Sequence, residues 1–367
     1  MPSALNPRTV VKLEKVSTWD GASFSLMVGL GEAYVPAFVL ALGMGDAASG
    51  LISTVPLVLG ALLQLFTLRF VRAAPSYRFW VVCCAIWQCL SFVPLIYLAA
   101  TAKASLPWVF FAAFIYWGAG MSAGPAWNAW MARIVPKKRR VIFWSRRTWL
   151  AFVGTFVGFV GGGWVLHATD GGMNGFLILF ALAMGFRLLS TLFLAAHPIT
   201  KRPPQATSFT DGLRYISKGK NAKFLRFMLL MNFAVYVAAP YFTAFMLVEL
   251  HLSYSSYVLL ISAALAAKVV ATPAVTRWVG LHGTQTLMWV TGSVIAVLPV
   301  LWLVSHSLIY LLALQILSGV VWAGLEIAFP IFLISDVAAK DRVPVLSLYN
   351  LGRAFAITFG SVIGAIL

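Results

Sequence analysis

The stretch GPAWNAWMARIVPKKRRVIFWSRR (Gly124–Arg147) passes from apolar, tryptophan-rich sequence into a segment with seven Lys or Arg residues and no acid. A boundary of this kind is typical of a helix that leaves a membrane on the cytoplasmic side, where positive charge accumulates. Trp127, Trp130 and Trp144 are then expected near the membrane interface. Two interpretations of the seven charges stay open: they anchor the topology and contact anionic headgroups, or they also act in gating.

The composition places the whole chain in a lipid bilayer. Of its 367 residues, 61% are hydrophobic and 10% are charged, and the mean hydropathy is +0.90. A soluble protein would have to bury nearly all of its surface to hide so much apolar area, whereas lipid accepts that surface. The net charge of +17 would otherwise suggest a nucleic-acid partner, but the placement of the charges between apolar runs argues against one.

Eleven apolar runs are long enough to cross a bilayer as helices, for which about 20 residues are needed. They cover residues 20–42, 50–71, 79–100, 107–132, 149–168, 174–196, 225–249, 254–275, 284–304, 308–335 and 350–367. Of the 27 Lys and Arg residues, 24 fall in one set of alternate gaps and only Lys103 in the other. The positive-inside rule then predicts a multi-pass protein with a cytoplasmic N-terminus, which we expect in a bacterial inner membrane.

No set of residues in the sequence predicts an enzyme. Cys83, Cys84 and Cys89 share one run without the His or the spacing of a metal site, and so are expected to be packing residues. GMGD (43–46) is similar to a motif of intramembrane aspartyl proteases, but no second acid lies in a suitable run. We expect no metal and no cofactor, and without a GxxxxGK[ST] loop an ATP-driven mechanism would need a separate subunit.

The second half of the chain repeats the first at an offset near 200 residues. The matching segments, in chain order, are GEAYVPAF (31–38) with VYVAAPYF (235–242), LRFV (68–71) with TRWV (276–279), and KKRRVIFWSRR (137–147) with AKDRVPVLSLY (339–349). The last match pairs Arg140 with Arg342. This order predicts two parallel copies.

The copies are expected to cover residues 1–197 and 225–367, joined by a cytoplasmic linker at 198–224. Within the linker, Phe209 and Leu213 follow a helical spacing, which predicts a short amphipathic helix on the membrane surface.

Two copies of six helices, a basic central linker and related loops after the second and eighth spans resemble the major facilitator superfamily. The family's loop pattern survives as RFVRAAPSYR (69–78) and RWVGLHG (277–283), with Arg72 and Gly280 where the family has Asp. The resemblance implies an all-α membrane protein of two parallel six-helix pseudo-repeats. Since eleven spans are visible and twelve are implied, we expect that the twelfth is missing, through truncation of the sequence or loss of the helix.

GTFVGFVGGG (154–163) is similar to the family's fifth-helix antiporter pattern, with Phe159 in place of its proline. Gly154, Gly158 and Gly162 share one helix face, which favours close approach of a neighbouring helix. Close packing alone explains them, and we prefer that interpretation to an antiporter function.

Charges inside the spans need a reason, because each costs at least about 2.5–3.5 kcal/mol at the bilayer centre. Glu32 lies about 18 Å along a helix from Asp20, at about 1.5 Å per residue, which predicts a position near the midplane. Gly29, Gly31 and Pro36 surround it and would loosen the helix, as at transporter binding sites.

The repeat places Tyr236 at the equivalent point of the seventh span, one turn after Asn232. The first and seventh helices of the family line the central cavity, so the resemblance implies that Glu32, Tyr236 and Asn232 bind substrate or couple a proton. The alternative is that Glu32 is satisfied by its neighbours and has no role in transport.

Arg187, Lys268 and Glu326 lie nine, seven and nine residues from the cytoplasmic end of their spans. Similar depth predicts that Lys268 and Glu326 neutralise each other. Arg187 has no acid at that depth in its own half, and its side chain is expected to extend toward the cytoplasm. For Asn128, facing the cavity and bonding to a neighbouring helix stay equally open.

The sequence therefore predicts a monomeric secondary transporter that moves a small solute by alternating access, coupled to H+. The alternative is a non-transporting membrane receptor or assembly factor that retained the fold. The residues expected to form the cytoplasmic gate are Arg140, Arg146, Arg147, Arg277, Arg342 and Asp341.

Overall fold

The computed structural model describes residues 7–198, 209–218, 221–239, 242, 245–252 and 254–366. These residues form helices and turns with no strand among them, so the predicted all-α class is confirmed. The described residues of each of the eleven predicted spans lie mostly on one helix or on consecutive helices. The elements that precede the linker are α1 (Pro7–Leu30), η1 (Glu32–Tyr34), α2 (Val35–Ala41), α3 (Asp46–Gln64), α4 (Thr67–Ala73), α5 (Tyr77–Leu90), α6 (Phe92–Thr101), α7 (Leu106–Ile134), η2 (Lys137–Arg139), α8 (Arg140–Ala168) and α9 (Met173–Ala195).

The elements that follow are α10 (Phe209–Lys218), α11 (Ala222–Ala238), the short π-helix η4 (Phe245–Glu249), α13 (Tyr254–His282), α14 (Thr284–Leu301), α15 (Leu308–Asp336) and α16 (Arg342–Ile366). Among the described residues, eight helical stretches are long and apolar enough to cross a membrane. The total number of spans, eleven or twelve, stays a prediction. Helix α10 lies in the predicted linker, whose residues 199–208, 219 and 220 are outside the described part of the chain.

The chain forms two compact units. Unit 1 takes the described residues of Met1–Arg139, Leu150–Thr207 and Ala339–Ser347, and unit 2 takes those of Arg140–Trp149, Ser208–Ala338 and Leu348–Leu367. The boundary between the units therefore falls between Arg139 and Arg140, in the middle of the basic segment.

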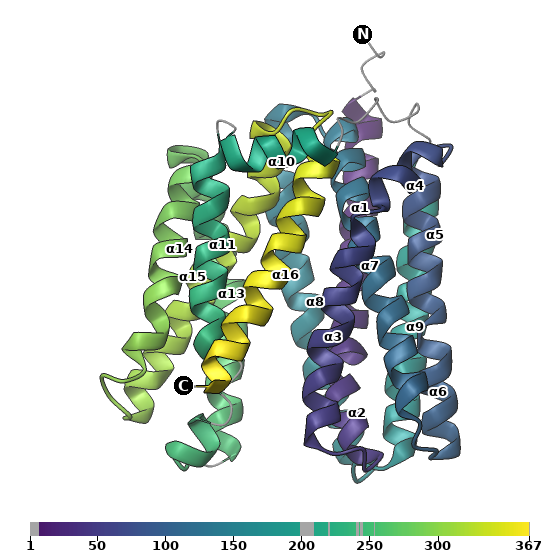
Figure 1. Ribbon diagram of the computed structural model, residues 1–367, viewed down its shortest axis with the longest axis vertical. Coiled ribbons are helices and arrows are strands. Elements are labelled where there is room, and N and C mark those ends of the chain that lie inside the picture. Colours follow the sequence, from purple (N-terminus) through teal and green to yellow (C-terminus); the bar gives the residue numbers. More distant parts are fainter. Residues whose placement is uncertain are drawn as a thin grey trace. The chain divides into compact units, whose positions relative to one another are not determined.

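Unit 1 is a helical bundle in which α1 packs on α9, α3 packs on α7, and α5 packs on both α7 and α9 (Figure 1). Its core is aromatic. Phe38 packs edge-on against Phe180 at a ring-centroid distance of 5.0 Å, and Phe92 packs against Tyr116 at 5.9 Å. Phe38, Phe92 and Phe180 are all buried.

Helix α8 approaches α1 through its glycines. A Cβ on Gly158 would lie 2.8 Å from the Leu26 carbonyl oxygen, and one on Gly154 would lie 2.9 Å from that of Ala22. A Cβ on Gly162 would meet the Tyr34 ring at 2.5 Å. The prediction that these three glycines serve close helix packing is confirmed.

Unit 2 places α13 and α14 against α15, and α11 beside α14 (Figure 1). Close approach again depends on glycine. A Cβ on Gly319 of α15 would lie 2.2 Å from the Ala264 carbonyl oxygen of α13, and one on Gly360 of α16 would lie 2.6 Å from that of Phe233 on α11. Gly360 follows Gly158 by 202 residues, the offset of the sequence repeat; Gly158 packs on α1 and Gly360 packs on α11.

The expected start of the first span is wrong. The first helix begins at Pro7, so Asp20 lies well inside it instead of at its start. Trp130 and Trp144 are buried, at 0% and 3% exposure, and their expected depth near the membrane interface stays a prediction.

Candidate functional site

A cavity of about 280 Å³ lies within unit 1. Its walls come from η1 and α2, α3, the junction of α5 and α6, and α7. Most of its lining is apolar, and its polar groups come from few side chains. The lining residues are Val28, Glu32, Ala33, Val35, Pro36, Ile52, Ser91, Phe92, Leu95, Ala112, Ala113, Tyr116 and Trp117.

Glu32 provides the carboxyl group of this cavity. The Tyr116 hydroxyl donates a hydrogen bond to Glu32 Oε2 at 2.6 Å, and the same hydroxyl lies 3.4 Å from the Met27 sulfur. Glu32 is half-buried and Tyr116 is buried. An apolar cavity with one hydrogen-bonded carboxyl group is a typical small-molecule site, in which few polar groups set orientation.

A break in the first span positions Glu32. Helix α1 ends at Leu30, the single 3-10 turn η1 begins at Glu32, and α2 begins at Val35 with Pro36 in its first turn. Proline suits that turn because its missing N–H would have no partner there. The helix that these residues were predicted to loosen is interrupted there.

The position of Glu32 along the first span differs from the prediction, because the prediction counted the distance along the helix from Asp20 as the start of the span. The apolar stretch runs over Val10–Ala41, and Glu32 lies 22 residues from its first residue and nine from its last. These bounds place Glu32 nearer the Ala41 end of the stretch than its middle.

A second polar cluster in unit 1 joins α1, α5 and α9. Arg187 donates to Gln88 Oε1 at 2.6 Å and to Ser190 Oγ at 2.7 Å, and Ser190 donates to Asp20 Oδ1 at 2.7 Å. Asp20, Gln88, Arg187 and Ser190 are all buried. We call these four residues the α1–α9 polar cluster.

The expectation that Arg187 extends toward the cytoplasm is therefore wrong, since its side chain is 4% exposed and directed into the bundle. Its guanidinium also lies 5.0 Å from the centroid of the Phe24 ring. The sequence contained a signal for the acid near Arg187. The first helix begins at Pro7 and continues through Lys12 and Lys15, so Asp20 is an acid inside that helix.

Lys268 on α13 and Glu326 on α15 form the predicted ion pair in unit 2, with Nζ 2.7 Å from Oε1. This pairing is confirmed. The two side chains are 21% and 38% exposed, so the pair is partly open to solvent. Its role in transport stays a prediction.

Asn232 is buried on α11, and its amide nitrogen donates to the Met228 carbonyl at 2.7 Å. Its Oδ1 accepts a hydrogen bond from Arg353 Nε of α16 at 3.2 Å, a partner that the sequence analysis missed. Arg353 was counted among the cytoplasmic charges, but it is the twelfth of 25 residues in α16. Tyr236 is half-buried on the same helix as Asn232.

Asn128 donates to the Gly124 carbonyl of its own helix at 2.9 Å, and its position facing the cavity stays a prediction. Among the predicted gate residues, Arg146 and Arg277 are exposed, Arg147 and Asp341 are half-buried, and Arg342 is buried.

Arg140 is buried, and its Nη1 donates to the Ile334 carbonyl near the end of α15 at 3.0 Å. The last four carbonyls of a helix lack partners within the helix, so a cation is favourable there.

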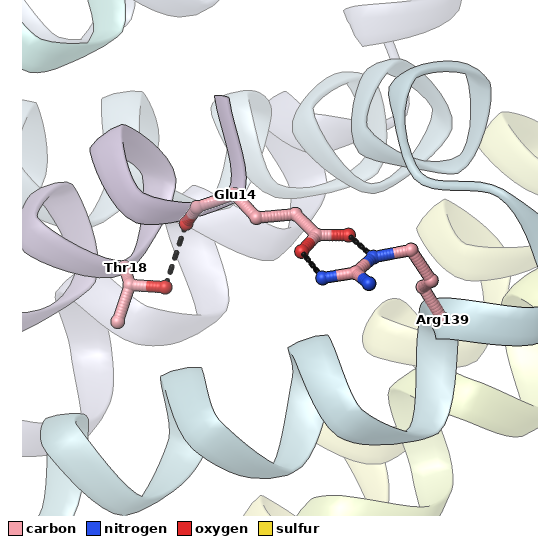
Figure 2. A network of polar contacts seen from close by, with 3 residues as sticks. All are labelled: Glu14, Thr18 and Arg139. Carbon is pink, nitrogen blue, oxygen red and sulfur yellow. Dashed lines mark hydrogen bonds and ion pairs between the residues drawn. The ribbon is translucent and has the colours of Figure 1, made fainter. Parts of the chain in front are cut away.

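Arg139, the residue before Arg140, binds within unit 1 instead. Its Nε and Nη2 donate to the two carboxylate oxygens of Glu14 on α1 at 2.8 and 2.6 Å (Figure 2). Thr18 donates to the Glu14 carbonyl at 2.7 Å, one turn along the same helix. The bidentate geometry fixes the direction of the Arg139 side chain.

The described residues contain no group of three or more His, Cys, Asp or Glu side chains placed to hold a metal ion. The three cysteines are free thiols, and Cys84 and Cys89 are buried as packing residues.

Comparisons with known proteins agree with this architecture. The sequence profile of the Major Facilitator Superfamily matches residues 22–361, and the chain belongs to this family of membrane transporters. No curated protein sequence matches the chain.

Several solved structures share the fold at low sequence identity. A bacterial homologue of the iron transporter ferroportin, in its outward-facing state, is 12% identical with a TM-score of 0.74, over 97% of this chain and 92% of that one. The fucose:proton symporter of E. coli is 12% identical with a TM-score of 0.73, over 97% and 91%. The human organic anion transporter TETRAN is 17% identical with a TM-score of 0.69, over 98% and 93%. Likeness at this identity shows the fold alone.

Proposed function

We propose that the protein is a secondary transporter that moves a small solute by alternating access and couples it to a proton at Glu32. The observation that carries the proposal is the single carboxyl group in the unit 1 cavity, held by Tyr116 at the break between α1 and α2. A carboxyl group in an apolar cavity can bind a proton from one side and release it to the other when its surroundings change.

The chemistry assigned to the other residues follows from their contacts. Tyr116 donates its hydroxyl hydrogen to Glu32, which holds the carboxyl group in place in the cavity. Lys268 and Glu326 are a second candidate for coupling, because a partly exposed pair can exchange its partners with solvent or solute. Tyr236 and Asn232 stay candidates for solute contact. Asn128 has no described contact outside its own helix.

The test is solute uptake by purified protein in vesicles, with and without a pH gradient, over a panel that includes fucose, xylose and organic anions. Glu32→Gln should abolish uptake against a gradient while exchange of the same solute continues. Asp170→Asn is a matched control, since Asp170 is exposed in a turn at φ 50°, which asparagine also tolerates.

A Glu32→Gln protein that accumulates solute as well as the unmodified protein would eliminate the coupling role. A receptor or assembly factor with this fold would give no flux of any member of the panel.

We also propose a cytoplasmic N-terminus, supported by the asymmetry of basic residues, which persists when Arg353 is removed from the count. Single cysteines in a cysteine-free background test it at Lys138 and Lys103, which are both exposed. An impermeant reagent outside cells should label the Lys103 position only. The earlier choice for a second cytoplasmic probe, Ser208, lies outside the described residues.

For gating, we propose that Arg140 and Asp341 act together to close the cytoplasmic side, with Arg146, Arg147, Arg277 and Arg342 as further gate residues. The support is the anchoring of Arg140 at Ile334 near the end of α15, because the acids Asp336 and Asp341 follow Ile334 by two and seven residues. Ala113→Cys in the cavity lining would serve as reporter. Arg140→Ala and Asp341→Ala should each raise its labelling from the cytoplasmic side, and the double variant should equal the stronger single one. Additive effects would show that the two residues act independently.

A further inference from the structure

Arg353 is a charged residue in the middle of a helix, and its side chain is exposed. It lies about 17 Å along α16 from Arg342, at about 1.5 Å per residue. A guanidinium at that depth against lipid is costly, so its exposed surface requires water or a partner of opposite charge.

Most of the face of α16 that suits lipid lies on the side of the helix opposite Arg353. The exposed large apolar residues of α16 are Phe355, Phe359, Val362, Ile363 and Ile366, at 41%, 60%, 51%, 41% and 79% exposure. At about 100° per residue, four of them lie roughly 120–180° around the helix axis from Arg353, and Ile363 lies about 80° from it. The exposed part of Arg353 therefore faces away from most of the apolar surface of α16.

Asn232 fixes the orientation of the guanidinium. It accepts the Nε–H of Arg353 at 3.2 Å, and its own amide is fixed by the Met228 carbonyl. Among the described residues no hydrogen bond is made by the two Nη groups of Arg353, and their paired N–H groups match a carboxylate or phosphate in bidentate geometry. Glu326, an acid within the helices of unit 2, is already bonded to Lys268.

We infer that Arg353, oriented by Asn232, binds an anionic group, a carboxylate or phosphate, of the solute that the protein carries. This inference rests on the proposed transport function and names its solute class. Arg353 contacts the anion, and Asn232 is a positioning residue.

The test is ligand-dependent thermal unfolding of the purified full chain in a neutral detergent, at constant ionic strength. The probes are benzoate, succinate and inorganic phosphate, with benzamide and succinamide as neutral counterparts. At least one anion should raise the unfolding temperature of the unmodified protein, whereas its neutral counterpart should not. Arg353→Gln should weaken that binding about 10- to 100-fold, as expected for a lost charge-assisted contact.

Three further variants separate charge from structure. Lys103→Gln removes an equal charge from an exposed loop and should bind as the unmodified protein does. Arg353→Lys keeps the charge and should retain part of the affinity. Asn232→Asp keeps an acceptor for Nε but adds a negative charge, so it should weaken anion binding even when its unfolding temperature without ligand is unchanged.

The inference is overturned if no anion of the panel stabilises the protein, or if Arg353→Gln binds as tightly as the unmodified protein. Stabilisation through Arg353 by phosphatidylglycerol micelles but by no soluble anion would also overturn it, since the site would then bind a lipid headgroup. If the unmodified protein and Arg353→Gln take up a neutral solute such as xylose equally well, the inference of an anionic solute is overturned, but the transport proposal stands.

Discussion

The two units bury their charges differently. In unit 1, Asp20 and Arg187 are 2% and 4% exposed and are joined through Ser190. In unit 2, the Lys268 and Glu326 side chains are 21% and 38% exposed, and Arg353 is exposed. The first arrangement is enclosed by three helices, whereas the second has polar atoms within reach of solvent.

This difference separates two uses of charge inside a membrane protein. An enclosed network whose members are bonded to one another fixes helices in place, because removing one member leaves another charge buried without compensation. A partly exposed pair costs less to break, since water can replace the lost partner. We therefore expect the α1–α9 polar cluster to act on stability, and the charges of unit 2 to act mainly on solute and conformational change.

The largest effect is expected from breaking the α1–α9 polar cluster. Asp20→Leu or Arg187→Leu alone should lower the free energy of unfolding by about 3–5 kcal/mol, because each leaves its partner buried with an uncompensated charge. The double variant should recover much of the loss. Equilibrium unfolding in mixed detergent measures this. Single variants as stable as the unmodified protein would remove the contrast between the units.

An intermediate effect is expected at the glycine contacts, which test whether the two units are packed alike. Gly158→Ala and Gly360→Ala should each cost about 1–3 kcal/mol, because the added Cβ would lie 2.8 and 2.6 Å from a backbone oxygen that cannot move alone. Gly161→Ala is the matched control, since nothing lies within 4 Å of its Cβ position. A loss at Gly158 but not at Gly360 would show that the repeat does not extend to this packing.

The smallest effect is expected at the ion pair of unit 2. Lys268→Gln, Glu326→Gln and the double variant should each change the free energy of unfolding by about 1 kcal/mol or less, because both side chains are partly solvated. A double-mutant cycle on the same unfolding curves gives the coupling. A coupling as large as the loss at Arg187 would mean that this pair is also structural.

The sequence was informative about helices and less so about partners. It predicted a loosened helix beside Glu32 from Gly29, Gly31 and Pro36, and it predicted the Lys268–Glu326 pair from similar depth, because both depend on the spacing along single helices. It missed Tyr116, since a tyrosine in an apolar run has no periodic signal that distinguishes a carboxyl partner from a packing residue.

The boundaries of helices explain most of the errors. Hydropathy placed the start of the first span at residue 20, because Lys12, Glu14 and Lys15 lower the average there, yet the helix continues through them from Pro7. That shift moved Asp20 to a membrane edge and left Arg187 without its acid. The same averaging placed Arg353 at the cytoplasmic end of the last run, although the helix begins eleven residues earlier at Arg342.

The sequence by itself determined the class of the protein, its helices and its family, because apolar composition, run length and the order of the repeat are properties of the chain alone. Only the tertiary structure decided which polar groups meet. Glu32 with Tyr116, Asp20 with Ser190 and Arg187, and Asn232 with Arg353 are bonds between helices that are distant in sequence. Such contacts depend on the rotation and depth of each helix against its neighbours, which are set by close packing and not by hydropathy.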